Sequence, residues 1–140
     1  MAWQLKGKVA KCEHREYGFA QIHVNKLGSG ADVLFEGLGG ELEVRGWRSA
    51  AKSYRLISES FQVWMSHGDQ LSEIPAEFHV IGHTSTAPFA AIVHNDKPWY
   101  GIQFHPEVTH SPRGREVIGK FVLDVCHCST HWTMVSDGVS

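Results

Sequence analysis

A series of short, β-rich runs separated by turns limits the fold of this chain more than any other feature. Each run is enriched in β-branched and aromatic residues, and the runs span 61–65, 78–84, 89–94 and 98–106. Short strands joined by tight turns are typical of an antiparallel meander. The next segment, 115–127, repeats apolar residues at helical spacing and predicts an amphipathic helix. The pattern therefore predicts an α/β chain made mostly of β-strands, with a helix near its C-terminal end.

The N-terminal part is patterned less clearly. Residues 1–11 are interpreted as the end of an amphipathic helix, 17–24 as a strand and 31–38 as a short helical turn. Residues 40–60 carry several basic side chains without a clear period and lie between two better patterned segments. We therefore predict that they are an atypical insertion on the surface of the domain.

Composition and charge exclude several classes of partner. The formal net charge is −2 at pH 7, so no basic surface indicates nucleic acid. No apolar run approaches the roughly 20 residues that span a bilayer, and the N-terminal residues lack the apolar stretch of a secretory signal. An odd count of three cysteines argues against a disulfide framework and fits a reducing, cytoplasmic location. We expect one domain over 1–134, a tail at 135–140, and no nucleic-acid or membrane partner.

The sequence GIQFHPE, residues 101–107, combines a strand end with an imidazole and a carboxylate two positions beyond it. Pro106 fixes its own φ angle and lacks a backbone donor, which restricts the exit from the strand. His105 and Glu107 can therefore share one turn, in which the carboxylate orients the ring and stabilises its protonated form. This predicts the base and the orienting acid of a nucleophile–His–acid triad. The pattern alone fits a His and a Glu in an ordinary polar loop equally well.

A second candidate site is the sequence WMSHGDQ, residues 64–70, interpreted as a strand that stops at a sharp turn. Glycine in such a turn allows a ligand to approach the backbone closely. The turn would offer main-chain groups and polar side chains to a small ligand, from Ser66, His67, Gly68 and Asp69. An Asx-type hairpin turn without a ligand is the alternative.

Histidines and cysteines raise two metal hypotheses. His67, Asp69 and His105 match the outline of a two-histidine, one-carboxylate facial triad for non-haem iron, which would make the chain an Fe(II) oxygenase. The sequence CHCSTH brings soft ligands together at Cys126, His127, Cys128 and His131, but its spacing matches no standard zinc finger. We expect no metal at either place.

Taken together and in order, several segments resemble one family. VWMSHGDQLSEIP, FAAIVHNDKPWYGIQFHPEVTHSPRG and KFVLDVCHCSTHWTM are similar to the glutaminase domain of GMP synthases, a branch of the class I glutamine amidotransferases. Upstream, MAWQLKGKVAKCEHREYGFAQIHV resembles the helix and strand that follow the nucleophile of that domain. The resemblance covers residues 1–39 and 61–134, and implies the C-terminal part of a flavodoxin-like, three-layer domain.

The resemblance also implies roles for single residues. His105 would be the general base and acid, and Glu107 would orient it. The substrate-binding residues Ser66, His67, Gly68 and Asp69 would contact the α-carboxylate and α-amino region of glutamine. Cys12, Cys126 and Cys128 match none of the nucleophile positions, so the nucleophilic cysteine is expected to be absent and the chain inactive by itself.

Cofactors and partners follow from the same resemblance. The parent enzyme would hydrolyse glutamine and use the ammonia to aminate XMP to GMP in purine nucleotide biosynthesis. We expect no cofactor in this chain, ATP and Mg²⁺ in a synthetase domain outside it, an ATP-pyrophosphatase domain as partner, and homodimerisation through a further C-terminal domain. A non-catalytic binding module is the remaining alternative.

Overall fold

The computed structural model describes residues 2–25, 33–38, 41–43, 55–57 and 60–130. Within these residues, five strands form the main sheet in the order β4-β1-β5-β6-β7, and all of the neighbouring pairs are antiparallel. The strands are β1 (Lys8–Val24), β4 (Ser60–Glu73), β5 (Phe78–His83), β6 (Ala91–His94) and β7 (Tyr100–Ile102). The helix α2 (Gly114–Lys120) follows them and continues as a π-helical turn, Phe121–Val125. A mostly antiparallel sheet with a C-terminal helix is the fold that the sequence predicts.

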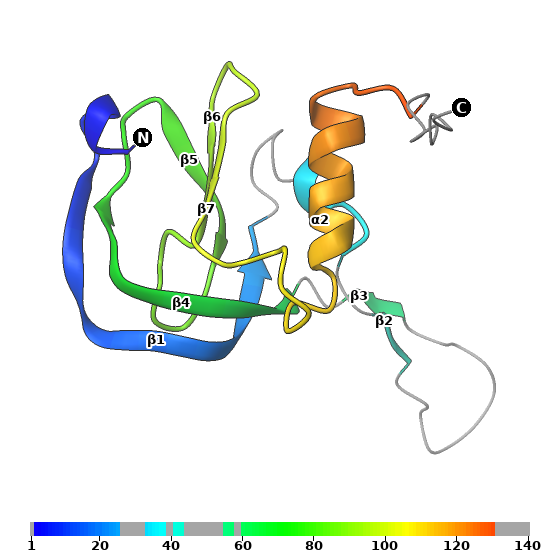
Figure 1. Cartoon of the computed structure of the whole chain (residues 1–140), viewed down its shortest axis with the longest axis horizontal. Coiled ribbons are helices and arrows are strands. Elements are labelled where there is room, and N and C mark those ends of the chain that lie inside the picture. The colour runs from blue at the N-terminus through cyan, green and yellow to red at the C-terminus, as the bar shows by residue number, and fades with distance from the viewer. Residues whose placement is uncertain (1, 26–32, 39–40, 44–54, 58–59, 131–140) are drawn as a thin grey trace, which may run out of the picture.

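The longest pairing in the sheet joins β1 and β4. In Figure 1 the two strands run side by side through the same bend. Their register places Phe19 opposite Trp64 and Gly18 opposite Met65, with an irregularity between Lys11 and Glu16. Gly18 has a φ of 127°, which side chains disfavour, so glycine is required at this point of the curved strand.

The pairing with β1 corrects the predicted turn at Ser66, His67, Gly68 and Asp69. These residues lie inside the continuous strand β4, opposite residues 11–17 of β1. The polar Ser-His-Gly-Asp run looks like a turn when it is viewed alone. Because β1 offers a long antiparallel partner, the backbone hydrogen bonds of the sheet override that local preference.

A second correction concerns the N-terminus, where a helix over residues 1–11 was expected. The structure has a single 3-10 turn at Trp3–Leu5, ended by Lys6 in the left-handed conformation with φ 68°. The chain then enters β1 at Lys8, which pairs with Glu73 of β4. Pairing across the sheet again decides the conformation.

The core lies on one face of the sheet. Along β4 the buried Phe61, Val63 and Met65 alternate with more exposed residues, as one buried sheet face requires. They pack with Ile22 and Phe104 and with other apolar side chains in one cluster. Each such burial stabilises the fold by about 1.5–3 kcal/mol.

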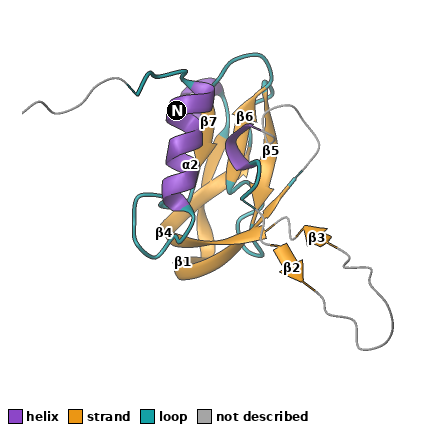
Figure 2. Ribbon diagram, turned by 90° about the vertical axis from the view of Figure 1, so that its right-hand side faces the viewer, coloured by secondary structure: helices purple, strands orange, loops and turns teal. Residues whose placement is uncertain are grey.

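The helix α2 runs beside the main sheet (Figure 2) and adds Val117 to the core cluster. Ile118, Phe121 and Leu123 remain 39%, 39% and 44% exposed. The predicted helix is therefore present, but most of its apolar residues are not covered by the part of the chain that the structure describes. No helix among the described residues has the length and apolar character needed to cross a membrane.

Within the predicted insertion at 40–60, the structure describes two short strands. β2 (Glu41–Glu43) and β3 (Arg55–Ile57) pair with each other in a separate two-stranded sheet. Residues 40, 44–54 and 58–59, Trp47 among them, lie outside the described residues, and Ser60 begins β4. The expected exposure of the insertion therefore stays a prediction.

The first turn of α2 lies directly against the segment that carries His105. A methyl group on Gly114 would overlap the backbone of Pro106, so glycine is needed there for close approach. Gly119, in the same helix, has nothing within 4 Å of the corresponding position.

These two glycines give a matched pair of substitutions. Gly114→Ala is expected to lower the free energy of unfolding by about 2–3 kcal/mol, because the helix or the turn must shift. Gly119→Ala is expected to raise it by about 0.5–1 kcal/mol, because alanine favours the helix. Urea denaturation measures both, and equal effects at the two positions would contradict the close contact.

Candidate active site

The candidate pair of His105 and Glu107 follows the last strand of the sheet. β7 ends at Ile102, and Phe104 forms an isolated antiparallel bridge with Met65 of β4. Beyond it the His105 N–H donates to the Trp64 carbonyl over 3.0 Å. The His105 Nδ1 and Glu107 Oε1 atoms are 2.8 Å apart, and the two side chains are 42% and 59% exposed. The spacing of the H-P-E sequence thus places imidazole and carboxylate in direct contact.

The contact fixes the protonation pattern of the pair. Glu107 accepts a hydrogen bond from the His105 ring and a second one from the backbone. These two bonds, the first more than the second, hold the pKa of the Glu107 carboxyl below its usual range. An ionised carboxylate can only accept, so Nδ1 of His105 carries the proton. Nε2 is then the ring atom that can accept and return a proton, as a general base requires.

One backbone carbonyl of the segment 66–69 of β4 is joined to the strand end that precedes this pair. The Gln103 side-chain amide donates to the Asp69 carbonyl over 2.7 Å, two residues before His105. Sequence reasoning missed Gln103, although its place inside GIQFHPE was the available signal. The structure therefore brings the backbone of Asp69 close to the strand end that carries His105.

His67 faces a different set of side chains. Its Nδ1 lies 3.5 Å from Cys12 Sγ, and its Nε2 lies 3.0 Å from Glu16 Oε2. The side chains of His67 and Glu16 are only 10% and 15% exposed. Their contact is within ion-pair distance but is not aligned as a hydrogen bond, and both atoms are shielded from solvent. No sequence pattern indicated that Cys12 and Glu16 would meet His67.

This arrangement overturns the iron-site alternative. Both ring nitrogens of His67 are occupied by contacts with Cys12 and Glu16. Among the described residues no group of three or more His, Cys, Asp or Glu side chains could hold a metal ion. The facial triad of an Fe(II) oxygenase is therefore wrong for this chain.

The three cysteines have no disulfide partner, and Cys126 and Cys128 are exposed. Burial raises the pKa of the Cys12 thiol, and the carboxylates of Glu16 and Asp69 raise it further. Because the thiolate is the reactive form, these surroundings make Cys12 a poor nucleophile near neutral pH.

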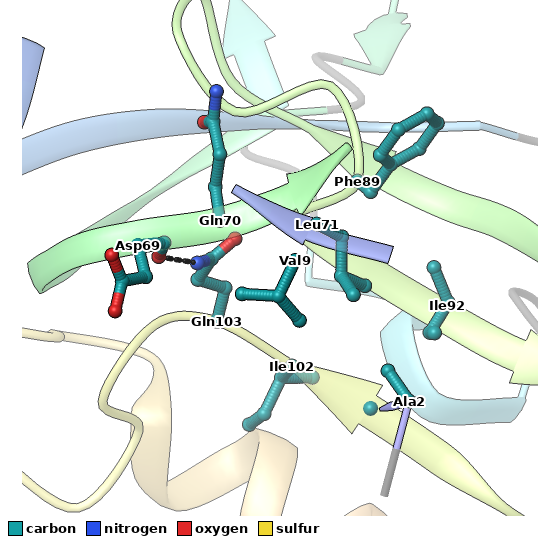
Figure 3. Close-up of a pocket in the computed structure, with 10 residues that line it drawn as sticks. Ala2, Val9, Asp69, Gln70, Leu71, Phe89, Ile92, Ile102 and Gln103 are labelled. Atoms are coloured by element: carbon teal, nitrogen blue, oxygen red, sulfur yellow. Dashed lines mark hydrogen bonds between the residues drawn. The ribbon is translucent and has the colours of Figure 1, made fainter. Parts of the chain in front are cut away.

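A cavity of about 260 Å³ opens beside Asp69 and Gln103 (Figure 3). Its other walls are mostly apolar and include Val9, Leu71 and Ile102. In Figure 3 the hydrogen-bonded Asp69 and Gln103 stand at one end and the apolar side chains at the other. An apolar hollow with a few polar groups at one end is typical of a site for a small ligand or side chain.

The pKa of Glu107 provides a direct test of the pair. His105→Ala removes the main cause of the lowered pKa, so the pKa should rise toward the usual value for glutamate. Carboxylate-detected NMR titration measures it. Glu116, whose pKa is lowered chiefly by its hydrogen bond to Arg113, should be unchanged and serves as the internal control.

The sign of the stability effect follows from the lowered pKa. The contact with His105 contributes to stability above the pKa of Glu107 in the unfolded chain, and this contribution is lost as the pH falls through the lower folded value. An unchanged Glu107 pKa in His105→Ala would show that the contact does not form in solution.

Comparison with known proteins agrees with the fold. Residues 1–125 match the model of the family described as glutamine amidotransferase class-I. The chain belongs to this family. It is 44% identical over 137 residues to the "GMP synthase [glutamine-hydrolyzing]" of Phaeosphaeria nodorum, covering 96% of this chain and 22% of that protein. It is 40% identical to the protein of the same name from Photorhabdus laumondii, covering 97% of this chain and 23% of that protein. The chain thus spans less than a quarter of the length of these relatives.

Solved structures show the same fold. A Thermoplasma acidophilum protein described as a putative GMP synthase subunit superposes with a TM-score of 0.69 at 25% identity, covering 90% of this chain and 51% of that one. A glutamine amidotransferase from Methylobacillus flagellatus gives a TM-score of 0.53 at 18% identity, covering 96% of this chain and 45% of that one. The second likeness bears on the fold alone.

Proposed function

We propose that this chain supplies the His–Glu part of a glutaminase site that provides ammonia for the amination of XMP to GMP. The contact of 2.8 Å between His105 Nδ1 and Glu107 Oε1 carries the proposal. It is supported by membership of the amidotransferase family and by the names of the relatives that are 40–44% identical. His105 is the general base and acid, and Glu107 orients it.

The proposed reaction is acyl transfer through a cysteine thiolate. His105 Nε2 accepts the thiol proton as sulfur attacks the carboxamide carbon of glutamine, and returns a proton to the departing ammonia. Water then attacks the thioester, with His105 again as base, and glutamate and the free thiol are released. Glu107 stabilises the imidazolium that forms at each proton transfer.

The nucleophile is proposed to come from polypeptide outside the 140 residues. Burial and neighbouring carboxylates disfavour the thiolate of Cys12, and Cys126 and Cys128 follow the helical segment at 114–125. The chain by itself is therefore proposed to lack glutaminase activity. A chain without a nucleophile can also be a non-catalytic binding module, and the activity assay described below can establish that outcome.

Substrate is proposed to bind along the backbone of β4 at Ser66, His67, Gly68 and Asp69. Support comes from the hydrogen bond between Gln103 and the Asp69 carbonyl, which joins this segment to the strand end of His105. Backbone groups would contact the α-carboxylate, and the Asp69 carboxylate would attract the α-ammonium group.

The remaining partners are proposed from the relatives. A synthetase part with an ATP-pyrophosphatase domain would use ATP and Mg²⁺ to activate XMP, and a further domain would form a homodimer. The three free thiols support a reducing, cytoplasmic location.

The decisive experiment grafts this chain into the Photorhabdus laumondii relative in place of the segment it matches. Release of glutamate from glutamine and formation of GMP are both measured. The graft should hydrolyse glutamine, and His105→Ala should reduce hydrolysis by about 10²–10⁴-fold, because the thiol loses its proton acceptor. Glu107→Ala should cost less, since it only orients the ring.

Two controls complete the assay. GMP formation from added ammonium salt should survive His105→Ala, because free ammonia bypasses the glutaminase site. The ungrafted chain should release no glutamate above the buffer rate. Full hydrolysis in the His105→Ala graft would contradict the role of His105 as general base and acid. Turnover by the chain alone would show that one of its own cysteines is the nucleophile.

A further inference from the structure

Three hydrogen bonds form a closed ring around the backbone of His105. The Trp64 N–H donates to Ser111 Oγ over 3.0 Å, and the Ser111 hydroxyl donates to the His105 carbonyl over 2.5 Å. The His105 N–H donates back to the Trp64 carbonyl over 3.0 Å. Every donor and acceptor in the ring is therefore used.

The position of this ring of hydrogen bonds in the sheet indicates what the Ser111 hydroxyl does. Met65 and Phe104 are antiparallel bridge partners, so Trp64 and His105 are the next pair in register. In a regular antiparallel ladder, the two residues of a hydrogen-bonded pair each donate their N–H to the carbonyl of the other. Here one bond is direct, and the Ser111 hydroxyl stands between the other donor and acceptor. The hydroxyl thus holds His105 away from β4 at the point where the strand ends.

Ser111 is itself firmly held. The residue is 4% exposed, its N–H donates to the Val108 carbonyl, and its own carbonyl accepts from the Gly114 N–H. The neighbouring His110 ring packs on Trp64 with ring centroids 4.5 Å apart. The turn from His105 to α2 is therefore anchored to β4 on one side and to the helix on the other.

We propose that Ser111 is a positioning residue for His105. The Ser111 hydroxyl sets the distance between β4 and the His105 backbone, and so directs the imidazole toward Glu107. Without the hydroxyl, the Trp64 N–H and the His105 carbonyl either lose a partner in a partly buried place or close directly on each other. Both outcomes displace the His105 backbone. The consequence for catalysis rests on the proposed function, but the effect on the His105–Glu107 contact does not.

The test uses the whole chain and compares Ser111→Ala with Ser111→Thr. Loss of the hydroxyl should raise the pKa of Glu107 toward its usual value and accelerate hydrogen exchange of the Trp64 amide by about tenfold. Threonine keeps a hydroxyl at the same position and should restore both readings. NMR titration and native-state exchange measure them on one labelled sample.

Thr84→Ala is the matched control. Thr84 is also 4% exposed, and its hydroxyl accepts from the Ala87 N–H over 2.9 Å in a different loop. The substitution removes a buried hydroxyl of the same kind and should leave the pKa of Glu107 unchanged. The carboxyl of Glu116, paired with Arg113, should keep its lowered pKa in all variants.

If Ser111→Ala does not fold, Ser111→Cys replaces it. A sulfur atom is larger and forms longer hydrogen bonds, so the pKa of Glu107 should again rise. The positioning role would be overturned if the pKa of Glu107 kept its parent value in the folded alanine variant, or in the cysteine variant if the alanine variant does not fold. A Thr84→Ala variant that shifts the pKa of Glu107 by as much would also overturn it.

The grafted enzyme separates this proposal from the previous one. There Ser111→Ala should lower kcat for glutamine hydrolysis by about tenfold or more with little change in KM, because the base is misplaced while the binding strand is intact. If His105→Ala leaves hydrolysis intact, the proposed function fails, yet the Glu107 and Trp64 readings still decide the role of Ser111.

Discussion

The backbone pairing between β4 and the residues after β7 is the constraint on which the rest of the site depends. It joins Met65 to Phe104 and Trp64 to His105, although about forty residues of chain separate the partners. The strand that is proposed to bind substrate and the turn that carries the proposed base are thereby placed side by side. The buried Met65 and Phe104 side chains belong to the core cluster, so this placement is supported by packing as well as by hydrogen bonds. The proposed function of this site is therefore linked to the stability of the sheet.

Two imidazole–carboxylate contacts near this edge differ in their surroundings. The His105–Glu107 pair is largely exposed, so solvent screens it and a proton can reach it easily. The His67–Glu16 pair is largely shielded from solvent and has the Cys12 thiol beside it. The first suits proton transfer, which needs access, and the second suits holding β1 and β4 together. The difference in burial thus suits two pairs of the same chemistry to different roles.

Much of the fold could be predicted from the sequence, because period and turn residues are local signals. The strands at 78–83 and 91–94 and the helix at 114–120 follow from such patterns. The contact of His105 with Glu107 also follows from a spacing of two residues around a proline. The continuous strand through Ser66–Asp69 could not be predicted, since it depends on β1, whose partner residues lie some fifty positions earlier. Ser111 and Gly114 stand in the quoted VTHSPRG sequence, yet only the folded chain shows that one bridges to Trp64 and the other contacts Pro106.

The most direct measurement of the central claim is the binding of L-glutamine to the grafted enzyme, followed by NMR on selectively labelled residues 60–73 and 103–107. We predict saturable shifts of the Gly68 and Asp69 amides together with the His105 ring. L-Glutamate and D-glutamine should bind more weakly, because the site must match both the carboxamide and the α-centre. Shifts confined to other parts of the chain, or equal shifts with D-glutamine, would contradict a shared site for the strand and the histidine.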